Sequence, residues 1–468
     1  MGRVRAASAA LFVVCVLGTP ATAQSLSDTL IKAYLNNPSL EVSRATVRGA
    51  DESVAQARAG LRPVVTANGS FVFEDSSDGL GASNAGSASL DGSVTVFDGG
   101  ATFAAVDGAK AGVEAARALL VATEQDVLLE AVTAYSDVLQ DIRIVELERT
   151  TLRVFMQELQ AARDRFEVGE VTRTDVSQAE AVVASSRSSL AAAIGSLAIS
   201  REAYLSVVGE PPGELSPPPP LPPLPATRDE AVAIAMREHP SIRAARFNEL
   251  AANFAVDSAR AAFRPTIDII GSVGVDRTSS EISGIFGSGR VNDTETSASV
   301  GVTASVPIIT GGVLSSGVRE AIALVEQTKA ELHDTARLIR QAVGESYASL
   351  EVARASIVAS REAIRAARIA FEGVREEALL GARTTLDVLD AETELLEAQT
   401  TLASAERDED VAAYALLSAM GKLTVDHLGL NVAEYDPNVN FNRVQSGPPG
   451  RFDGSVVDRI RRRFGRTD

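Results

Sequence analysis

Residues 298–312 read ASVGVTASVPIITGG, and this stretch decides the fold. Apolar and polar residues alternate from Ala298 to Val306, which is the pattern of a β-strand with one apolar face. Gly311 and Gly312 follow, and glycine is favoured where a turn needs unusual backbone angles. A helical pattern then continues to residue 379. The stretch therefore predicts a strand that ends in a tight turn and leads directly into a very long helix.

Three other segments alternate in the same way, so the sequence predicts four strands arranged as two β-hairpins. We place the hairpins at residues 64–97 and 266–309, with polar loops at 76–87 and 277–295. Strands of ~10 residues with one apolar face are typical of transmembrane β-barrels, although a sheet on a soluble core shows the same alternation. Four strands cannot close a barrel, and open edges are not tolerated in lipid. Two chains would give a barrel with a filled interior, and three, with about twelve strands, an open lumen.

The chain contains an internal repeat. The segment ARAGLRP at 57–63 recurs as ARAAFRP at 259–265, and GEVT at 169–172 aligns with GART at 381–384. Ordered matches of this kind indicate a duplicated domain rather than a short solenoid repeat.

The repeat and its flanks divide the chain into consecutive parts. The first repeat covers residues 24–210 and the second covers 226–421. Between them, residues 211–225 contain nine Pro and form a stiff connector. Residues 422–468 have no repeat partner and are rich in Arg near their end, so we expect a mobile solvated tail.

Each repeat begins with a helix, as at residues 26–61, and continues after its hairpin into a long helix and a returning helix. The long helices are expected at 100–166 and 312–379, and the returning helices at 172–208 and 384–420. Apolar and small residues recur every seven positions in the second long helix, which indicates coiled-coil packing. Gly169 and Gly381 stand where the chain turns back, a position that favours a left-handed cap.

The first residues indicate export from the cytoplasm. Arg3 and Arg5 precede a short apolar run at 7–18, and Ala21-Thr22-Ala23 forms a cleavage site before Gln24. Residues 1–23 therefore read as a secretory signal peptide, although an uncleaved anchor has the same general pattern. No later segment is apolar for ~20 residues, so we expect no membrane-spanning helix.

Composition argues against several classes of function. The formal net charge of −18 disfavours nucleic acid, because phosphate binding needs Lys and Arg. The single Cys excludes a disulfide framework, and the three dispersed His lack the spacing of metal ligands. Neither a phosphate-binding loop nor a nucleophile elbow is present, so we expect no enzyme, no metal and no cofactor.

The candidate functional residues lie in GARTTLDVLD at 381–390. Asp387 and Asp390 are three positions apart and so share one helix face. In a closed oligomer their copies would form stacked carboxylate rings, which select cations and whose mutual repulsion raises some pKa values. The alternative is an ordinary helix start, where Asp is favoured by the helix dipole. The first repeat retains Asp175 but has Gln178 in place of Asp390, so we expect only one of the two helical hairpins to line a pore.

With these motifs placed, the sequence resembles the TolC family of outer-membrane efflux and secretion ducts over residues 26–425. FEVG at 166–169, VPIITGG at 306–312 and the stretch 381–390 carry the resemblance. It implies a homotrimer with a shared twelve-stranded barrel in the outer membrane lipid and a long periplasmic α-helical tunnel. It also implies a periplasmic adaptor and an inner-membrane transporter as partners.

The resemblance also assigns roles to residues. Asp387 and Asp390 would be the acidic rings of an iris-like aperture, and Arg383 with Thr174 and Asp175 would lock it. The turns at Gly169 and Gly381 would be the adaptor-docking sites. One departure is Ala378, which stands where a Tyr contributes to the lock in the family, so fewer hydrogen bonds of ~1 kcal/mol each would hold the closed state.

Two other interpretations remain open from the sequence. A general diffusion porin would conduct constitutively and be indifferent to the acidic rings. An extracytoplasmic coiled-coil structural protein would need no detergent. The sequence names neither the exported substrate (a drug, a metal ion or a polypeptide) nor the pump and adaptor.

Overall fold

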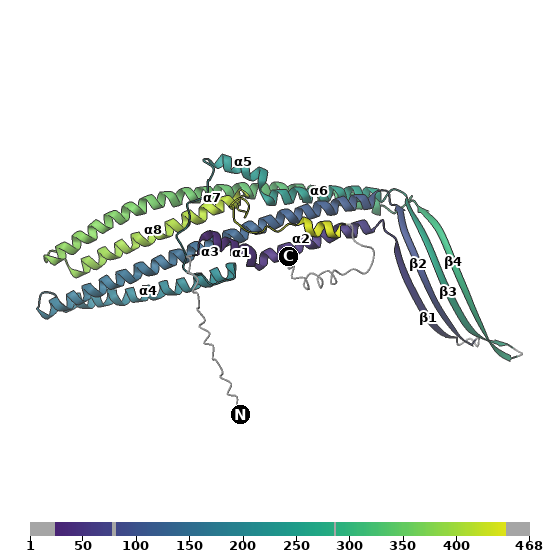
Figure 1. Cartoon of the computed structure of the whole chain (residues 1–468), viewed down its shortest axis with the longest axis horizontal. Coiled ribbons are helices and arrows are strands. Elements are labelled where there is room, and N and C mark those ends of the chain that lie inside the picture. Colours follow the sequence, from purple (N-terminus) through teal and green to yellow (C-terminus); the bar gives the residue numbers. More distant parts are fainter. Residues whose placement is uncertain (1–23, 77–80, 285–286, 446–468) are drawn as a thin grey trace, which may run out of the picture. The chain divides into compact units, whose positions relative to one another are not determined.

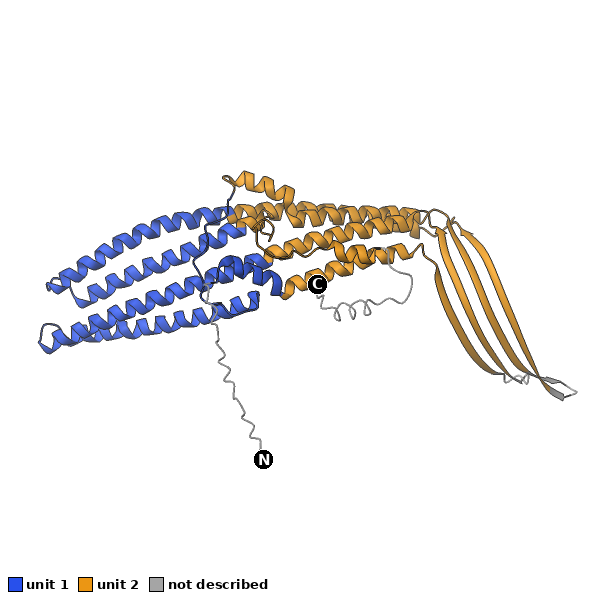
Figure 2. Ribbon diagram, viewed as in Figure 1, with its two compact units in different colours: residues 1–37, 127–224, 347–415 blue, residues 38–126, 225–346, 416–468 orange. Residues whose placement is uncertain are grey.

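The computed structural model describes residues 24–76, 81–284 and 287–445. The signal peptide expected at 1–23 and the Arg-rich end of the tail lie outside these residues. The chain divides into two compact units (Figure 2). Unit 1 contains residues up to 37 together with 127–224 and 347–415, and unit 2 contains 38–126, 225–346 and the chain from 416 onward.

The described elements follow the repeat predicted from the sequence (Figure 1). In the first repeat these are α1 (Leu26–Asn36), α2 (Pro38–Ala59), β1 (Val64–Ser76), β2 (Gly81–Phe97), α3 (Ala101–Glu167) and α4 (Arg173–Val208). In the second they are α5 (Arg228–Glu238), α6 (Pro240–Ala261), β3 (Thr266–Gly284), β4 (Gly287–Ser305), α7 (Val313–Leu379) and α8 (Thr385–Ala419). The short helix α9 (Asn438–Val444) follows them.

The helix expected at 26–61 is two helices. Pro38 has no backbone N–H to continue α1, and the preceding Asn37 has an extended backbone with ψ of 123°. The Asn37 side chain instead donates to the carbonyl oxygen of Val207 at 3.0 Å. The second repeat breaks at the corresponding pair, His239-Pro240, where ψ of His239 is 128°. The prediction of one continuous helix over residues 26–61 was wrong. It did not take into account that a proline disfavours helical backbone angles at the residue before it, here Asn37.

The four strands form one antiparallel sheet in the order β1-β2-β3-β4. The strands are longer than predicted, because β2 begins at Gly81 and because β3 and β4 pair as far as Gly284 and Gly287. The loops expected at 76–87 and 277–295 are therefore mostly strand. Their backbones are paired although most of the side chains are polar, so polarity alone was a poor signal for a loop.

One face of the sheet is apolar and the other mostly polar. Val65, Leu90, Val273 and Ala298 lie across the sheet on the apolar face, together with Val300, whose exposure is 85%. On the opposite face, serine and other polar side chains bond between strands: Asn68 to Asp91 at 2.8 Å, Ser70 to Ser87 at 2.7 Å and Ser272 to Ser299 at 2.8 Å. Strands β1 and β4 are the edges, and neither has a second neighbour in the sheet.

Helix α4 is more apolar than the sequence analysis expected of any segment after the signal peptide. By length and composition alone it could cross a membrane, and little of its most apolar part is buried within the described chain. Ala and Ser make up much of its sequence, and its large apolar residues Ile194, Ile199 and Leu205 are exposed. Small residues of this kind suit close packing between helices as well as lipid.

The described part of the tail is docked rather than free. In unit 2 the segment from Val425 to Gln445 is held by side chains of α2 and α3, and α9 contacts α2. Its bonds are Val425 N–H to Glu124 at 2.8 Å, Asn440 to Asp51 at 2.8 Å and the Gln445 carbonyl to Arg58 at 2.6 Å. The guanidinium of Arg117 also lies over the ring of Phe441, 5.1 Å from its centre. The mobile tail was therefore a wrong prediction for residues 422–445, because it rested on the lack of a repeat partner.

Candidate functional site

The turn between α3 and α4 is fixed by one glycine and one capping box. Gly169 has φ of +83°, and a Cβ there would meet no atom within 4 Å, so its backbone conformation alone requires glycine. Glu170 N–H donates to the carbonyl of Arg165 at 2.9 Å, which closes α3. Thr172 then opens α4: its hydroxyl accepts from the Asp175 N–H at 3.3 Å, and its own N–H donates to the Asp175 carboxylate at 2.8 Å.

The turn between α7 and α8 repeats this construction. Gly381 has φ of +79° with open space around it, and Ala382 N–H donates to the carbonyl of Glu377 at 2.9 Å. The capping box is formed by Thr384 and Asp387, with bonds of 3.2 and 2.8 Å. Both predicted turns are therefore confirmed as left-handed glycine turns that lead into capped helices.

Asp387 has a structural role that the sequence prediction treated only as an alternative. The backbone N–H and hydroxyl of Thr384 donate to its carboxylate and lower its pKa. Within one chain this shift is opposite to the raised pKa expected for a carboxylate ring. Asp390, one turn further along α8, is exposed. The shared face is present, but the rings themselves need further copies of the chain.

Arg383 does not bind the predicted lock residues. Its Nε donates to Glu377 Oε2 at 2.9 Å, across the turn from the last part of α7. Within the described part of the chain it makes no hydrogen bond or ion pair to Thr174, which is exposed, or to Asp175, which caps α4. Sequence reasoning missed Glu377, although the tight glycine turn places residues six apart on opposite sides of the same loop.

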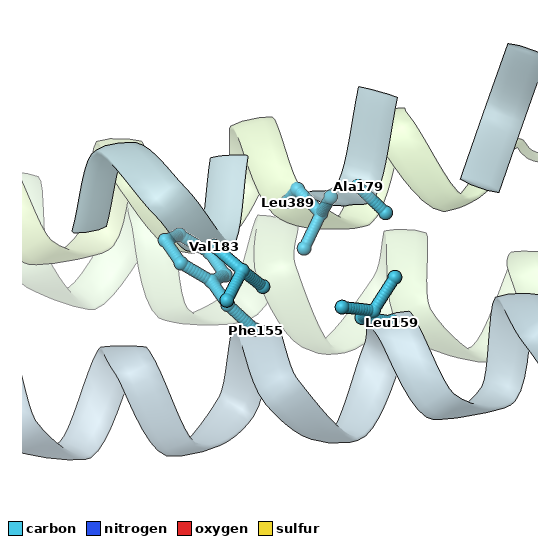
Figure 3. Packing of buried hydrophobic residues seen from close by; sticks show 5 residues of the cluster. All are labelled: Phe155, Leu159, Ala179, Val183 and Leu389. Atoms are coloured by element: carbon cyan, nitrogen blue, oxygen red, sulfur yellow. The ribbon is translucent and has the colours of Figure 1, made fainter. Parts of the chain in front are cut away.

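Unit 1 packs α8 against the first helical hairpin. Leu389 of α8 enters a cluster with Phe155 and Leu159 of α3 and with Ala179 and Val183 of α4 (Figure 3). Leu389 is 1% exposed, whereas Ser177, its counterpart by repeat position, is exposed. The turn of the second hairpin is therefore attached by side-chain packing close to Asp387 and Asp390.

A row of polar contacts continues this attachment along α3 and α8. From the turn inward, these are Thr151 to Glu392 at 3.1 Å, Arg143 to Glu406 at 2.7 Å, Gln140 to Ser404 at 2.9 Å and Asp137 to Arg407 at 2.7 Å. Burial raises the pKa of Glu392 against the smaller opposing effect of the Thr151 hydroxyl. We call these four pairs the α3–α8 ladder. Any movement of the second hairpin away from the first has to break them.

Asp410 lies beyond the ladder on α8. Burial, with repulsion from Glu409 and Glu406, raises its pKa to about 6. Arg354 pairs with Glu409 at 3.1 Å and Arg361 with Glu406 at 3.6 Å, so α7 supplies the cations that balance this acidic segment.

The described residues contain no group of three or more His, Cys, Asp or Glu side chains placed to hold a metal ion.

Comparison with known proteins assigns this architecture to a family. The sequence profile described as outer membrane efflux protein matches residues 30–210 and 232–422, one segment in each repeat. The chain belongs to the outer membrane efflux protein family. The resemblance inferred from the turns and strand ends is thereby confirmed, and the chain is an outer membrane efflux channel with a large periplasmic portion.

Individual relatives agree with this membership. The outer membrane efflux protein BepC of Brucella suis is 37% identical over 441 residues, which cover 94% of each chain. The outer membrane protein TolC of Escherichia coli is 27% identical, covering 93% of this chain and 90% of its own. The crystal structure of VceC from Vibrio cholerae superposes with a TM-score of 0.69 at 24% identity, over 85% of this chain and 96% of that one, and so shows the same fold.

Proposed function

We propose that three copies of the chain form one passive exit duct of a tripartite efflux or type I secretion system. The observation that carries the proposal is the four-stranded sheet with its apolar face and its two unpaired edges. In lipid each unpaired backbone N–H and C=O costs several kcal/mol, so β1 of one copy has to pair with β4 of another. Three copies supply about twelve strands, which leaves an open lumen.

The exposed face of α4 supports the same assembly. Ile194 and Ile199 project from a helix that is little buried within its own chain. A neighbouring copy would cover them, so the periplasmic helices would form a closed tunnel as the strands close a barrel. Small residues along α4 let the helices of two copies approach closely.

The aperture of this duct would be formed by the second hairpin. Asp387 is held in place by its capping bonds, and Asp390 is exposed on the same helix face. Three copies would place two stacked acidic rings in the lumen, which would favour cations and bind a multivalent cation that enters from the helical end.

The lock would join copies of the chain. Arg383 is already bound to Glu377 of its own hairpin, so Thr174 and Asp175 would be reached on a neighbouring copy. Ala378 is buried at 7% exposure, and its methyl group offers no hydrogen bond at the position where the family resemblance places a Tyr. Opening would break the lock and then the α3–α8 ladder, so that the second hairpins swing outward.

Partner docking is proposed at the two turns. Val168, next to Gly169, is 72% exposed, and Leu380, next to Gly381, is 85% exposed. Equivalent apolar side chains at both turns would present a ring of repeated contacts to a periplasmic adaptor. An inner-membrane transporter would supply the energy, since the proposed duct is passive.

Two measurements on the detergent-solubilised protein test the proposal. Native mass spectrometry should give three times the mass of the mature chain, and planar bilayers should show a small cation-selective conductance. A detergent-free monomer without conductance would overturn the duct. A large conductance indifferent to removal of the acidic residues would leave the barrel and refute the aperture.

A further inference from the structure

Gln24, the residue predicted to become the amino terminus of the mature chain, is held in unit 1 by hydrogen bonds to both its backbone and its side chain. Its backbone N–H donates to the carbonyl of Glu214 at 2.7 Å, and its carbonyl accepts from the Ser216 N–H at 3.1 Å. It thereby pairs with the Pro-rich linker as a short parallel bridge to Leu215. The hydroxyl of Tyr135 also donates to the Gln24 carbonyl at 3.3 Å.

The side-chain amide of Gln24 is held on both of its atoms. Oε1 accepts from the Gly213 N–H at 3.3 Å, which fixes the orientation of the amide. Nε2 donates to the Tyr204 hydroxyl at 2.6 Å, and the distance from that hydroxyl to Thr29 Oγ1 is 2.9 Å. Because the oxygen of Tyr204 accepts from Nε2, its proton is directed to Thr29, whose hydroxyl in turn donates to the Ser25 carbonyl at 3.2 Å. Tyr204 and Thr29 are both fully buried, at 0% exposure, so Nε2 of the partly buried Gln24 reaches a buried pair of hydroxyls. A hydrogen bond is stronger in such surroundings than in water.

An amino-terminal glutamine has a characteristic reaction. The α-amine nitrogen attacks Cδ, the N–Cδ bond forms and the Cδ–Nε2 bond breaks. Nε2 leaves as ammonia and takes up the proton that the α-amine gives up. The product is a five-membered lactam, pyroglutamate, and its mass is lower by one ammonia. No oxidant or other reactant is needed.

We propose that the fold protects Gln24, once it is the amino-terminal residue, from cyclising to pyroglutamate. In the folded chain the attacking nitrogen is directed to Glu214 and the leaving nitrogen to Tyr204, so the two are engaged by separate partners. Ring closure would remove Nε2, which donates a hydrogen bond to the Tyr204 hydroxyl, and would pull the amide oxygen away from the Gly213 N–H. An open glutamine at residue 24 would therefore report that α1 and the linker are docked. The inference rests on cleavage after Ala23 and is independent of the channel function.

The test follows the mass of the amino-terminal peptide of the full mature protein, kept folded in detergent at 37 °C and neutral pH. A synthetic peptide of residues 24–36 is the unprotected reference. The folded protein should begin at Gln24 and form the lactam at least tenfold more slowly than the peptide, since several hydrogen bonds of about the usual net strength must break. The proposal is overturned by a different first residue, or by equal rates in protein and peptide.

Two variants assign the protection to the amide network. Tyr204→Phe removes the nearer acceptor of Nε2 and leaves only Thr29 Oγ1, at 3.4 Å. It should speed lactam formation roughly fivefold relative to the parent protein, which is the factor that the loss of one net hydrogen bond gives. Tyr414→Phe removes a hydroxyl from another buried tyrosine of unit 1 and should leave the rate unchanged. An unaltered rate in Tyr204→Phe would refute the assignment. The comparison of parent protein with peptide does not depend on either variant folding.

Discussion

The two helical hairpins are built on the same turn but are used differently. Both have a left-handed glycine followed by a Thr–Asp capping box. Helix α8, however, begins with buried residues packed on α3 and α4, whereas most of the corresponding part of α4 is exposed. Duplication therefore conserved the turn, while the side chains beyond it determine which hairpin is held within the chain and which has a face free for a neighbouring copy.

The largest expected effect concerns Leu389. Leu389→Ala leaves a cavity in the cluster with Phe155 and should lower the free energy of unfolding by about 2–4 kcal/mol. Ser177→Ala, at the equivalent position of the first repeat, is exposed and should change it by less than about 0.5 kcal/mol. Thermal and urea unfolding of the two variants measures the difference. Equal losses would refute the asymmetry between the hairpins.

The second effect is the pH dependence contributed by Asp410 of the second repeat. The pKa of Asp410 is raised from 3.8 to about 6, so the folded state binds this proton more tightly than the unfolded chain. The buried charge of Asp410 lowers the free energy of unfolding by its full amount above pH 6, and this loss disappears as the pH falls toward 4. With allowance for partial exposure, the protein should be about 1 kcal/mol more stable at pH 5 than at pH 7 from this group.

Asp410→Asn is the control for that pH dependence, because it removes the titrating carboxyl group. The first repeat has Ala198 at the equivalent position and therefore offers no matching variant. The variant should lose this part of the pH dependence in melts at pH 5 and pH 7. An unchanged pH profile would show that Asp410 is ionised at little cost.

The third effect should be equal in the two repeats. Gly169→Ala and Gly381→Ala each force a side chain into a backbone with positive φ, in open space. Each should cost about 1 kcal/mol of stability from backbone strain alone. Paired thermal melts check this. A loss at one glycine only would mean that the two turns are not equivalent.

The smallest effect on stability separates structure from function. Asp175→Asn and Asp387→Asn both weaken a capping box and should lower the melting temperature slightly and by similar amounts. Their effects on ion conduction should differ, because only Asp387 is proposed to face the lumen. Conductance changes of the same size in both variants would remove that distinction.

Particular residues show what the sequence could predict. Gly169, Gly381 and the alternation that ends at Val306 are local signals, and the turns and strands they predicted are present. The break at Asn37 was equally local but was missed, because the effect of Pro38 on the residue before it was not applied.

Long-range contacts were beyond the sequence. The Arg383–Glu377 pair, by contrast, is local, and the glycine turn between the two residues was a signal that could have predicted it. The docking of Asn440 on Asp51 joins residues almost 400 positions apart and leaves no periodic signal. That Asp387 caps α8 as well as being the aperture candidate became clear only from the geometry of the turn.

The most direct test of the central claim is single-channel conductance of the parent, the double variant Asp387→Asn/Asp390→Asn and the control Asp175→Asn. A multivalent cation is added on the side of the helical turns. We expect a small, cation-selective current that the cation blocks in the parent and in Asp175→Asn, and a larger unblocked current in the double variant. Block that persists in the double variant, or that is lost in Asp175→Asn, would contradict an aperture formed by the second hairpin.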